Sequence, residues 1–278
     1  MTQSPFGPWI PTLLDIVDRA GQAILDVYES DFSVVAKADA SPLTQADLAA
    51  HKVIVDGLTL MTPDIPVISE ESEPPGYEVR KQWDRYWLVD PLDGTKEFVN
   101  RNGEFTVNIA LIEGQHPILG VVGVPVQQKI YVGDVGQAEA RVYEQGNSRL
   151  LSPQRRDAHA QSITVVASRS HGGDRLASYL EQIEARFSPC ERRPVGSSLK
   201  LCVLAEGLAD IYPRLGPTSE WDIGAAQAVL EAAGGAVLTP DGASLPYNSK
   251  ESLLNPEFLA VSDGSFDWLA ALPGFPDP

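Results

Sequence analysis

The segment that most constrains the fold of this chain is an apolar run that ends abruptly in two carboxylates. Trp87-Leu-Val leads straight into Asp90-Pro91-Leu92-Asp93-Gly94. Such a run is typical of a buried strand, and Pro91 lacks the N–H that a continuing ladder or helix would need. The chain must therefore turn there, which places two carboxylates three residues apart at the end of a buried strand. Gly94 permits a close backbone approach, and the residues after it can begin a helix whose free N–H groups face an anion.

Oxygen ligands beside backbone amides suit Mg²⁺ that is held partly by protein and partly by a phosphate. A turn with solvated carboxylates is the alternative for this segment. Two other acids stand at the edge of an expected element, Glu70 after an apolar run and Asp222 at a helix start. Their alternatives are the first residue of an acidic loop and a helix cap. Asp47 has a similar alternative, because Thr44-Gln-Ala-Asp47 has the spacing of a capping box.

Hydrophobic periodicity predicts two amphipathic helices near the start of the chain, over 11–28 and 44–61. Short β-rich runs follow, and we expect strands over 66–69, 86–90, 106–112, 118–124 and 129–132. The pairs Glu113-Gly114 and Pro125-Val126 indicate tight connections between neighbouring antiparallel strands.

A polar, turn-rich stretch over 152–161 interrupts this pattern and is the expected domain boundary. The elements expected after it are strands over 163–168, 208–212, 236–238 and 258–261, and helices over 174–186, 197–206 and 222–233. Strands that cluster first and alternate with helices later predict an α/β protein, with an α+β half over 1–152 and an α/β half over 153–278.

The charge balance excludes several classes of partner. The 278 residues include 21 Lys and Arg against 38 Asp and Glu, a formal net charge of −17. Such a chain would repel a nucleic-acid polymer, and it has no basic patch for an anionic membrane. A small anion could still bind if something reverses the sign of the charge locally.

Targeting and redox signals are few. Cys190 and Cys202 are too few for a disulfide framework and too far apart for a CxxC motif, so we expect two reduced thiols. No apolar run is long enough to span a bilayer, and the N-terminus lacks the pattern of a signal peptide. We expect a cytoplasmic protein, with peripheral association at the inner membrane as an alternative.

Three blocks together carry a family resemblance. They are Ile68-Ser-Glu-Glu-Ser72, Asp90-Pro-Leu-Asp-Gly-Thr95, and Trp221-Asp-Ile-Gly-Ala-Ala226 with Ala233-Gly-Gly235. In this order and spacing the chain resembles the inositol monophosphatase-like superfamily of Mg²⁺-dependent, lithium-sensitive phosphatases. The resemblance implies a layered αβαβα fold and two or three Mg²⁺ ions as cofactors.

The resemblance also implies a role for each matched residue. The Mg²⁺ ligands would be the carboxylates of Glu70, Asp90, Asp93 and Asp222 and the carbonyl of Leu92. Asp47 and Thr95 would orient the attacking water and help to deprotonate it. Gly94 and Thr95 would donate backbone N–H groups to the scissile phosphate.

Within the superfamily, the chain resembles the bacterial CysQ-type 3′(2′),5′-bisphosphate nucleotidases. The matching stretches are Lys37–Asp47, Asp93–Phe98, Arg101–Ala110, Ser168–His171, Gly196–Lys200 and Tyr212–Pro217. This implies that Ser197, Lys200 and Arg214 hold the 5′-phosphate of adenosine 3′,5′-bisphosphate, with His171 near the base. It also implies a place in sulfur assimilation.

The residues that the resemblance assigns to substrate binding also have structural alternatives. Lys200 could be a solvated cation on the exposed side of helix 197–206, and Arg214 could form a surface ion pair with Glu220. His171 could be merely an exposed loop residue.

Other functions remain as alternatives at this stage. The same chemistry could act on inositol monophosphate or fructose 1,6-bisphosphate, and the fold could serve a non-catalytic sensor of cations or nucleotides. Whether 3′-phosphoadenosine 5′-phosphosulfate is a further substrate stays open, and nothing in the sequence predicts an oligomeric state. The chain has no GxxxxGK[ST], HExxH, GxGxxG or GxSxG motif, which leaves other enzyme classes without support.

Overall fold

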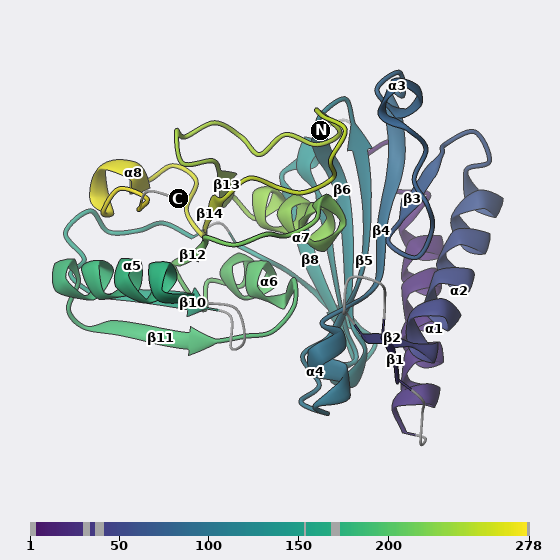
Figure 1. Ribbon diagram of the computed structural model, residues 1–278, viewed down its shortest axis with the longest axis horizontal. Helices are drawn as coiled ribbons and strands as arrows, with labels where there is room; N and C mark the ends of the chain where they lie inside the picture. Colours follow the sequence, from purple (N-terminus) through teal and green to yellow (C-terminus); the bar gives the residue numbers. More distant parts are fainter. Residues whose placement is uncertain (1–3, 30–33, 37–41, 153, 168–172, 277–278) are drawn as a thin grey trace.

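The computed structural model describes residues 4–29, 34–36, 42–152, 154–167 and 173–276. These residues form five layers in the order helix, sheet, helix, sheet, helix (Figure 1). The arrangement confirms the expected α/β fold with αβαβα layering. No helix among the described residues has the length and apolar character needed to cross a membrane.

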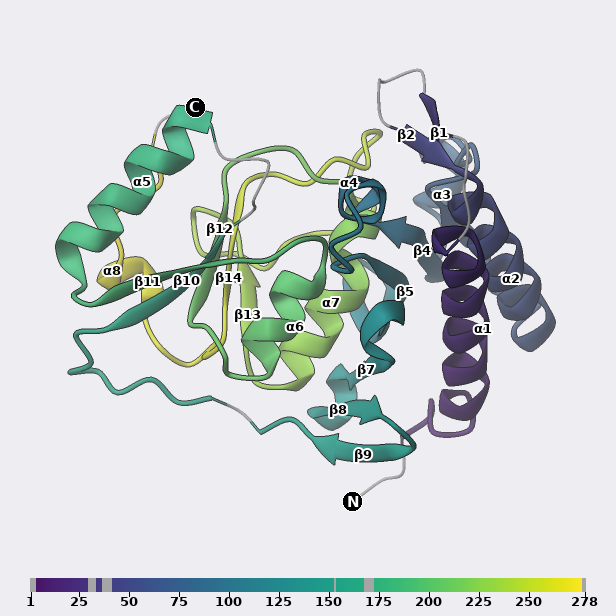
Figure 2. The same ribbon diagram turned by 90° about the horizontal axis from the view of Figure 1, so that it is seen from below.

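The first helix layer consists of α1 (Ile10–Tyr28) and α2 (Gln45–Met61), which pack side by side (Figure 2). Both helices contact the large sheet, α1 mainly through β6 and α2 through β4. Their observed bounds lie within one residue of the predicted ones. Strong periodicity explains this agreement, because one apolar face of each helix is buried.

The large sheet has the strand order β3-β4-β5-β6-β7-β8-β9. Its strands are β3 (Val67–Ser69), β4 (Arg85–Asp93), β5 (Thr106–Glu113), β6 (His116–Val124), β7 (Lys129–Asp134), β8 (Glu139–Glu144) and β9 (Asn147–Leu150). Only the β3–β4 pair is parallel. The two connections expected from Glu113-Gly114 and Pro125-Val126 do join antiparallel neighbours. Short helices flank these strands, namely α3 (Tyr77–Arg80), α4 (Thr95–Val99), Pro125–Gln127 and Val135–Gln137.

The prediction that the chain turns at Pro91 is wrong in one respect. Strand β4 continues through Pro91 to Asp93, and its register with β5 shifts between Asp90 and Asp93. An irregularity of this kind frees the intervening residues from the ladder, so a residue without an N–H is tolerated there.

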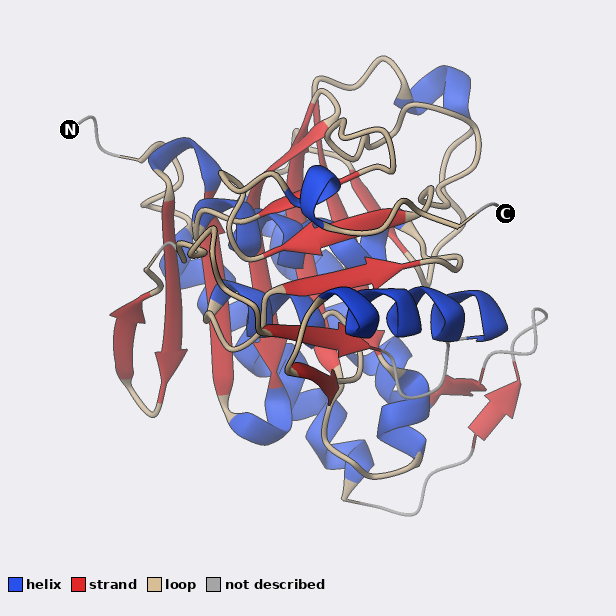
Figure 3. Cartoon of the chain, turned by 90° about the vertical axis from the view of Figure 1, so that its left-hand side faces the viewer, coloured by secondary structure: helices blue, strands red, loops and turns tan. Residues whose placement is uncertain are grey.

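The smaller sheet has the strand order β11-β10-β12-β14-β13. Its strands are β10 (Ile163–Ala167), β11 (Cys190–Pro194), β12 (Ile211–Arg214), β13 (Ala236–Leu238) and β14 (Phe258–Val261). Figure 3 shows that the strands of the two sheets run in crossing directions. Strand β12 begins three residues later than expected at 208. A third pairing, of β1 (Val34–Ala36) with β2 (Pro42–Thr44), was not predicted.

Helices α6 (Leu199–Ala205) and α7 (Glu220–Ala232) lie between the two sheets. The close packing of α7 depends on Gly120 of β6, because a Cβ there would lie 2.1 Å from the carbonyl oxygen of Ala225. Helices α5 (Gly173–Arg186) and α8 (Trp268–Ala271) cover the other face of the smaller sheet.

One buried cluster contains residues of both halves of the chain, among them Leu88 and Ala110 from the large sheet and Val229 from α7. The two halves therefore share a hydrophobic core. The division at 152/153 stays a prediction, and it falls between β9 and β10.

Candidate active site

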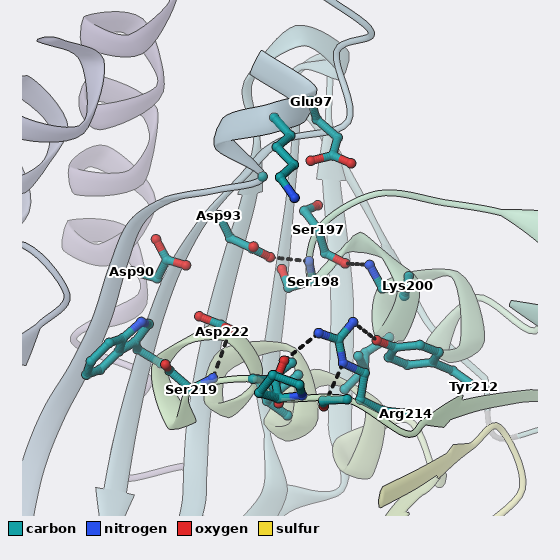
Figure 4. A pocket seen from close by; sticks show the side chains of 18 of the residues that line it. Asp90, Asp93, Glu97, Ser197, Ser198, Lys200, Tyr212, Arg214, Ser219 and Asp222 are labelled. Carbon is teal, nitrogen blue, oxygen red and sulfur yellow. Dashed lines mark hydrogen bonds between the residues drawn. The ribbon is translucent and has the colours of Figure 1, made fainter. Parts of the chain in front are cut away.

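A cavity of about 640 Å³ lies where the carboxyl end of β4 meets the starts of α4, α6 and α7 and the end of β12 (Figure 4). It brings together most of the residues predicted from the sequence. Those that line it are Glu70, Asp90, Leu92, Asp93, Gly94, Thr95, Ser197, Lys200, Arg214 and Asp222. Asp47 is buried on α2 outside the lining. His171, together with the stretch Ser168–His171, lies outside the described residues.

Three carboxylates form the acidic end of this cavity. Glu70, Asp90 and Asp222 each place a carboxylate oxygen within 4.8 Å of the other two. The three acids come from different elements: Glu70 comes directly after β3, Asp90 lies in the last part of β4, and Asp222 is in the first turn of α7. The fold thus joins three segments that are far apart in sequence.

The sequence-based alternatives for these acids fare differently. A solvated turn is wrong for Asp90, whose side chain is 1 % exposed and accepts the N–H of Leu92 at 3.0 Å. The capping alternative for Asp222 is correct, because its Oδ2 accepts the N–H of Ser219 at 2.9 Å in a capping box. Asp222 therefore caps helix α7 and belongs to the acidic cluster at the same time.

Burial, together with neighbouring acids, raises the pKa values of the three aspartates in the cavity. Burial, followed by the charge of Glu70 and further acids including Asp47, raises the pKa of Asp90 well above its usual value. The pKa of Asp222 is also raised well above its usual value, by burial and by the charge of Asp93. For Asp93, burial raises the pKa to about 6, although Lys200 and the N–H of Ser198 oppose the shift.

The chemistry of this donor set fits a small divalent cation. Magnesium prefers carboxylate and carbonyl oxygens, and a positive ion among these acids would relieve the repulsion that contributes to the raised pKa values of Asp90 and Asp222. The described residues therefore provide a cluster that could hold a metal ion.

Gly94 sets the local geometry beside this cluster. Its φ is +93°, and an added Cβ would lie 3.2 Å from Cβ of Ser197 and 3.4 Å from the carbonyl oxygen of Glu104. A side chain at this position would strain the backbone and displace the neighbouring loop. Helix α4 begins directly afterwards at Thr95, as expected.

Two cations form the other end of the cavity. Lys200 is 6 % exposed, and its Nζ donates to the carbonyl oxygen of Ser197 at 2.6 Å. The alternative of a solvated lysine is wrong, because α6 is buried along its whole length between the two sheets.

Arg214 is held by the loop that follows β12. Its Nε donates to the carbonyl oxygen of Gly216 at 3.1 Å, and Nη2 donates to that of Pro217. The alternative of an ion pair with Glu220 is wrong, because the Glu220 carboxylate accepts the N–H of Asn248 at 3.0 and 3.1 Å.

The two cations repel one another. Burial lowers the pKa of Lys200 to about 8, and the charge of Arg214 lowers it further, whereas the charge of Asp93 raises it. An anion placed against both would remove this repulsion. Figure 4 shows Lys200 and Arg214 on one side of the cavity, opposite Asp90 and Asp222.

Three polar residues next to the acids were missed by sequence reasoning: Thr106, Asn108 and Ser198. All are buried, and Ser198 donates its N–H to the Asp93 carboxylate. A signal was available, since Thr106 and Asn108 alternate with apolar residues in a strand that is otherwise apolar.

Comparisons with known proteins agree with this site and fold. A model of the inositol monophosphatase family matches residues 8–266. The 3′(2′),5′-bisphosphate nucleotidase CysQ of Escherichia coli is 52% identical over 242 residues, which cover 86% of this chain and 94% of the relative. The protein of the same name from Haemophilus influenzae is 36% identical over 259 residues, with coverage of 92% and 93%.

Solved structures give the same result. The crystal structure of CysQ from Bacteroides thetaiotaomicron, described as a bacterial member of the inositol monophosphatase family, matches with a TM-score of 0.79 and 40% identity. The match covers 93% of this chain and 98% of that one. An inositol monophosphatase from Thermotoga maritima matches with a TM-score of 0.75 at 21% identity, over 94% and 95% of the two chains, and supports the fold alone. The resemblance inferred from the three sequence blocks is confirmed, and the chain belongs to the inositol monophosphatase family.

Proposed function

We propose that this protein is an Mg²⁺-dependent phosphatase that removes the 3′-phosphate of adenosine 3′,5′-bisphosphate and yields AMP and phosphate. The observation that carries the proposal is the presence of two charge poles in one cavity. Crowded carboxylates form one pole, and Lys200 with Arg214 forms the other. A bisphosphate has an anionic group for each pole, whereas inositol monophosphate has only one. The activity for which the CysQ relatives are named supports the same substrate class.

At the acidic pole, two or three Mg²⁺ ions would be held by the four carboxylates of Glu70, Asp90, Asp93 and Asp222 and by the carbonyl of Leu92. When bound, these ions would neutralise the phosphate oxygens and lower the pKa of the attacking water. The negative net charge of the chain is then no obstacle to an anionic substrate.

The chain's own groups would orient the reaction at phosphorus. Asp47 and Thr95 orient the attacking water and help to deprotonate it, with the Asp47 carboxylate as the final acceptor of the proton, and the N–H groups of Gly94 and Thr95 hold the phosphate oxygens. A bond forms between the water oxygen and phosphorus while the bond from phosphorus to the ribose O3′ breaks. The departing alkoxide takes up a proton to become the 3′-hydroxyl of AMP.

At the basic pole, the hydroxyl of Ser197 and the cations of Lys200 and Arg214 would bind the 5′-phosphate. An arginine there offers two parallel donors to phosphate, and it leaves the hydroxyls of inositol without an acceptor. The 5′-phosphosulfate of 3′-phosphoadenosine 5′-phosphosulfate would meet the same groups. The assignment of His171 to the base stays a prediction.

A phosphate-release assay with adenosine 3′,5′-bisphosphate and Mg²⁺ tests the proposal. We expect turnover by the wild type and a loss of at least about 100-fold in kcat/KM in Arg214→Glu, because charge reversal replaces attraction by repulsion at a half-buried position. Arg19→Glu is a matched control on the exposed face of α1, where the side chain is 60 % exposed, and it should leave kcat/KM unchanged. Absence of phosphate release, or an unaffected Arg214→Glu, would contradict the proposal.

Chelation provides a second test, because the stripped acidic pole should repel the substrate. We expect excess EDTA to abolish nucleotide binding as well as turnover. Tight binding of the bisphosphate in EDTA, measured by calorimetry, would be incompatible with this account.

A further inference from the structure

The register of β4 and β5 places polar residues opposite the two aspartates of β4, which belong to the acidic pole. Asp93 pairs with Thr106, and Asp90 pairs with Asn108, on either side of the register shift. Thr106 and Asn108 point to the same face of β5, since they are two residues apart. That face also meets Ser198, the residue before α6.

The three side chains close a ring of hydrogen bonds, here called the polar ring. The hydroxyl of Ser198 donates to Oδ1 of Asn108 at 2.7 Å, and Nδ2 of Asn108 donates to Oγ1 of Thr106 at 3.2 Å. Oγ1 of Thr106 and Oγ of Ser198 are 2.8 Å apart. Since the Ser198 hydrogen is engaged with Asn108, the Thr106 hydroxyl is the donor in this third bond. Each member thus donates once and accepts once within the ring.

The polar ring is buried, and its members are at most 2 % exposed. Burying three polar side chains is costly unless every group is paired, and a hydrophobic trio could fill the same space. What the ring adds over apolar packing is direction, because hydrogen bonds fix the position of Ser198 relative to β5.

Ser198 links the ring to the acidic pole. Its backbone N–H donates to Oδ2 of Asp93, while its side chain is a member of the ring. The preceding loop is tied to the same region, since the N–H of Gly196 donates to Oε2 of Glu104 at 2.7 Å. The start of α6 is therefore anchored on β5, and one oxygen of Asp93 is anchored on the start of α6.

We propose that the polar ring of Thr106, Asn108 and Ser198 is a positioning device that holds Asp93 in the orientation needed for a divalent cation. The inference rests on the proposed function, which makes Asp93 a ligand. With Oδ2 fixed by Ser198, the other oxygen is presented in one orientation. Groups that orient a ligand in this way strengthen metal affinity by about 10- to 100-fold.

Two variants of Thr106 separate positioning from packing. Thr106→Val keeps the shape and removes the hydroxyl, whereas Thr106→Ser keeps the hydroxyl and removes a methyl. We expect Mg²⁺ binding without nucleotide, measured by calorimetry, to weaken about tenfold in Thr106→Val and by less than about twofold in Thr106→Ser. A role in packing alone predicts the opposite order, and that result would overturn the proposal.

Ser198→Ala provides an independent test of the polar ring. It removes the hydroxyl and so breaks the ring, but it keeps the backbone N–H that donates to the Asp93 carboxylate. We expect the same weakening of Mg²⁺ binding of about tenfold, with KM for the bisphosphate at saturating Mg²⁺ within about twofold of wild type. The double variant with Thr106→Val should bind Mg²⁺ no more weakly than either single variant, because one broken bond already opens the ring. The proposal would be overturned if the losses of Mg²⁺ affinity in the two single variants added fully in the double variant. It would also be overturned if Ser198→Ala bound Mg²⁺ as tightly as the wild type. If Thr106→Val does not fold, the result for Ser198→Ala decides.

The outcomes for the two proposals are distinguishable. If the wild type binds no Mg²⁺ and releases no phosphate, the proposed function fails. If the wild type does both and Thr106→Val binds Mg²⁺ equally well, only the role of the polar ring is refuted.

Discussion

Two regions of this molecule bury carboxylates, and they do so in opposite ways. Near the outer face of the smaller sheet, Asp263 is 3 % exposed and is surrounded by donors. Nη1 of Arg155 donates to Oδ1 at 3.0 Å, the N–H of Arg156 donates to Oδ2 at 2.8 Å, and Ser265 donates twice. In the active-site cavity, Asp90 instead faces other acids.

The pKa values register this difference. Burial raises the pKa of Asp263, but hydrogen bonds from Ser265, Arg156 and Arg155 outweigh burial and lower it below the usual value. The pKa of Asp90 rises because burial and neighbouring acids act in the same direction. A buried acid that is paired with protein cations stabilises the fold, whereas a buried acid such as Asp90, whose charged neighbours are other acids, favours a site for a cation from solution.

The paired region also explains how the polar stretch over 152–161 is held. The guanidinium of Arg156 lies 5.4, 5.6 and 4.9 Å from the ring centres of Phe187, Phe266 and Trp268, and its Nη1 contacts Asp210 at 3.0 Å. The stretch in which we expected a domain boundary is therefore fixed to the second half of the chain.

The largest effect should come from removing a charge at the active site. We expect Asp90→Asn to lower kcat/KM by at least about 10³-fold at saturating Mg²⁺, because loss of metal-ligand charge costs several kcal/mol in the transition state. Asp263→Asn should keep kcat/KM within about twofold. Equal losses in a steady-state phosphate assay would break the contrast between the two regions.

The reverse ranking is expected for stability. Asp263→Asn should lower the free energy of unfolding by about 3 kcal/mol at pH 8, since charge-assisted hydrogen bonds are lost and Arg155 is left with an incomplete partner. The pKa of Asp263 is lowered in the folded state, so this contribution is lost as the pH falls below the unfolded value near 4. Urea unfolding of the wild type and Asp263→Asn at pH 8 and pH 4 measures the stability difference and its dependence on pH. A stability difference that is larger at pH 4 than at pH 8 would be inconsistent with this pairing.

A smaller effect of opposite sign is expected for Asp93→Asn without metal. The pKa of Asp93 is about 6 in the folded protein, above its usual 3.8, so its contribution to stability is full below pH 4 and declines as the pH rises to 6. An asparagine does not titrate. The difference between the pKa values of about 6 and 3.8 corresponds to about 3 kcal/mol, and weakening of the charge-assisted hydrogen bond from Ser198 offsets part of it. In EDTA at pH 8 the variant should therefore be more stable than the wild type by about 2 kcal/mol, and the stability difference should shrink towards pH 4. A variant less stable than the wild type at pH 8 would disprove the assigned repulsion.

Much of the fold was predictable because periodicity is strong where one face is buried, as in α1 and α2. Strands β8, β9 and β11 were missed. Their sequences are rich in charged and polar residues, for instance Cys190-Glu-Arg-Arg-Pro194 in β11. Strands β9 and β11 lie at sheet edges, and β8 is the neighbour of the edge strand β9, so these positions do not require two apolar faces.

The active site was predictable in composition but only partly in geometry. Its acids lie near the ends of strands or in the first turn of a helix, so their places could be anticipated from local pattern. The burial of Lys200 could not be predicted, because it depends on two sheets that enclose α6. The polar ring could not be predicted either, because it depends on the register of β4 and β5. Long-range packing of this kind leaves little trace in a single sequence.

Asp263 is paired with protein cations, whereas we propose that the acids of the active-site cavity form a site for a metal ion. The most direct test of this difference is calorimetry of Mg²⁺ binding without nucleotide by the wild type, Asp263→Asn and Asp90→Asn. We expect saturable binding by the wild type and by Asp263→Asn, and loss of that binding in Asp90→Asn. Undiminished binding in Asp90→Asn, or no saturable binding by the wild type, would contradict the account.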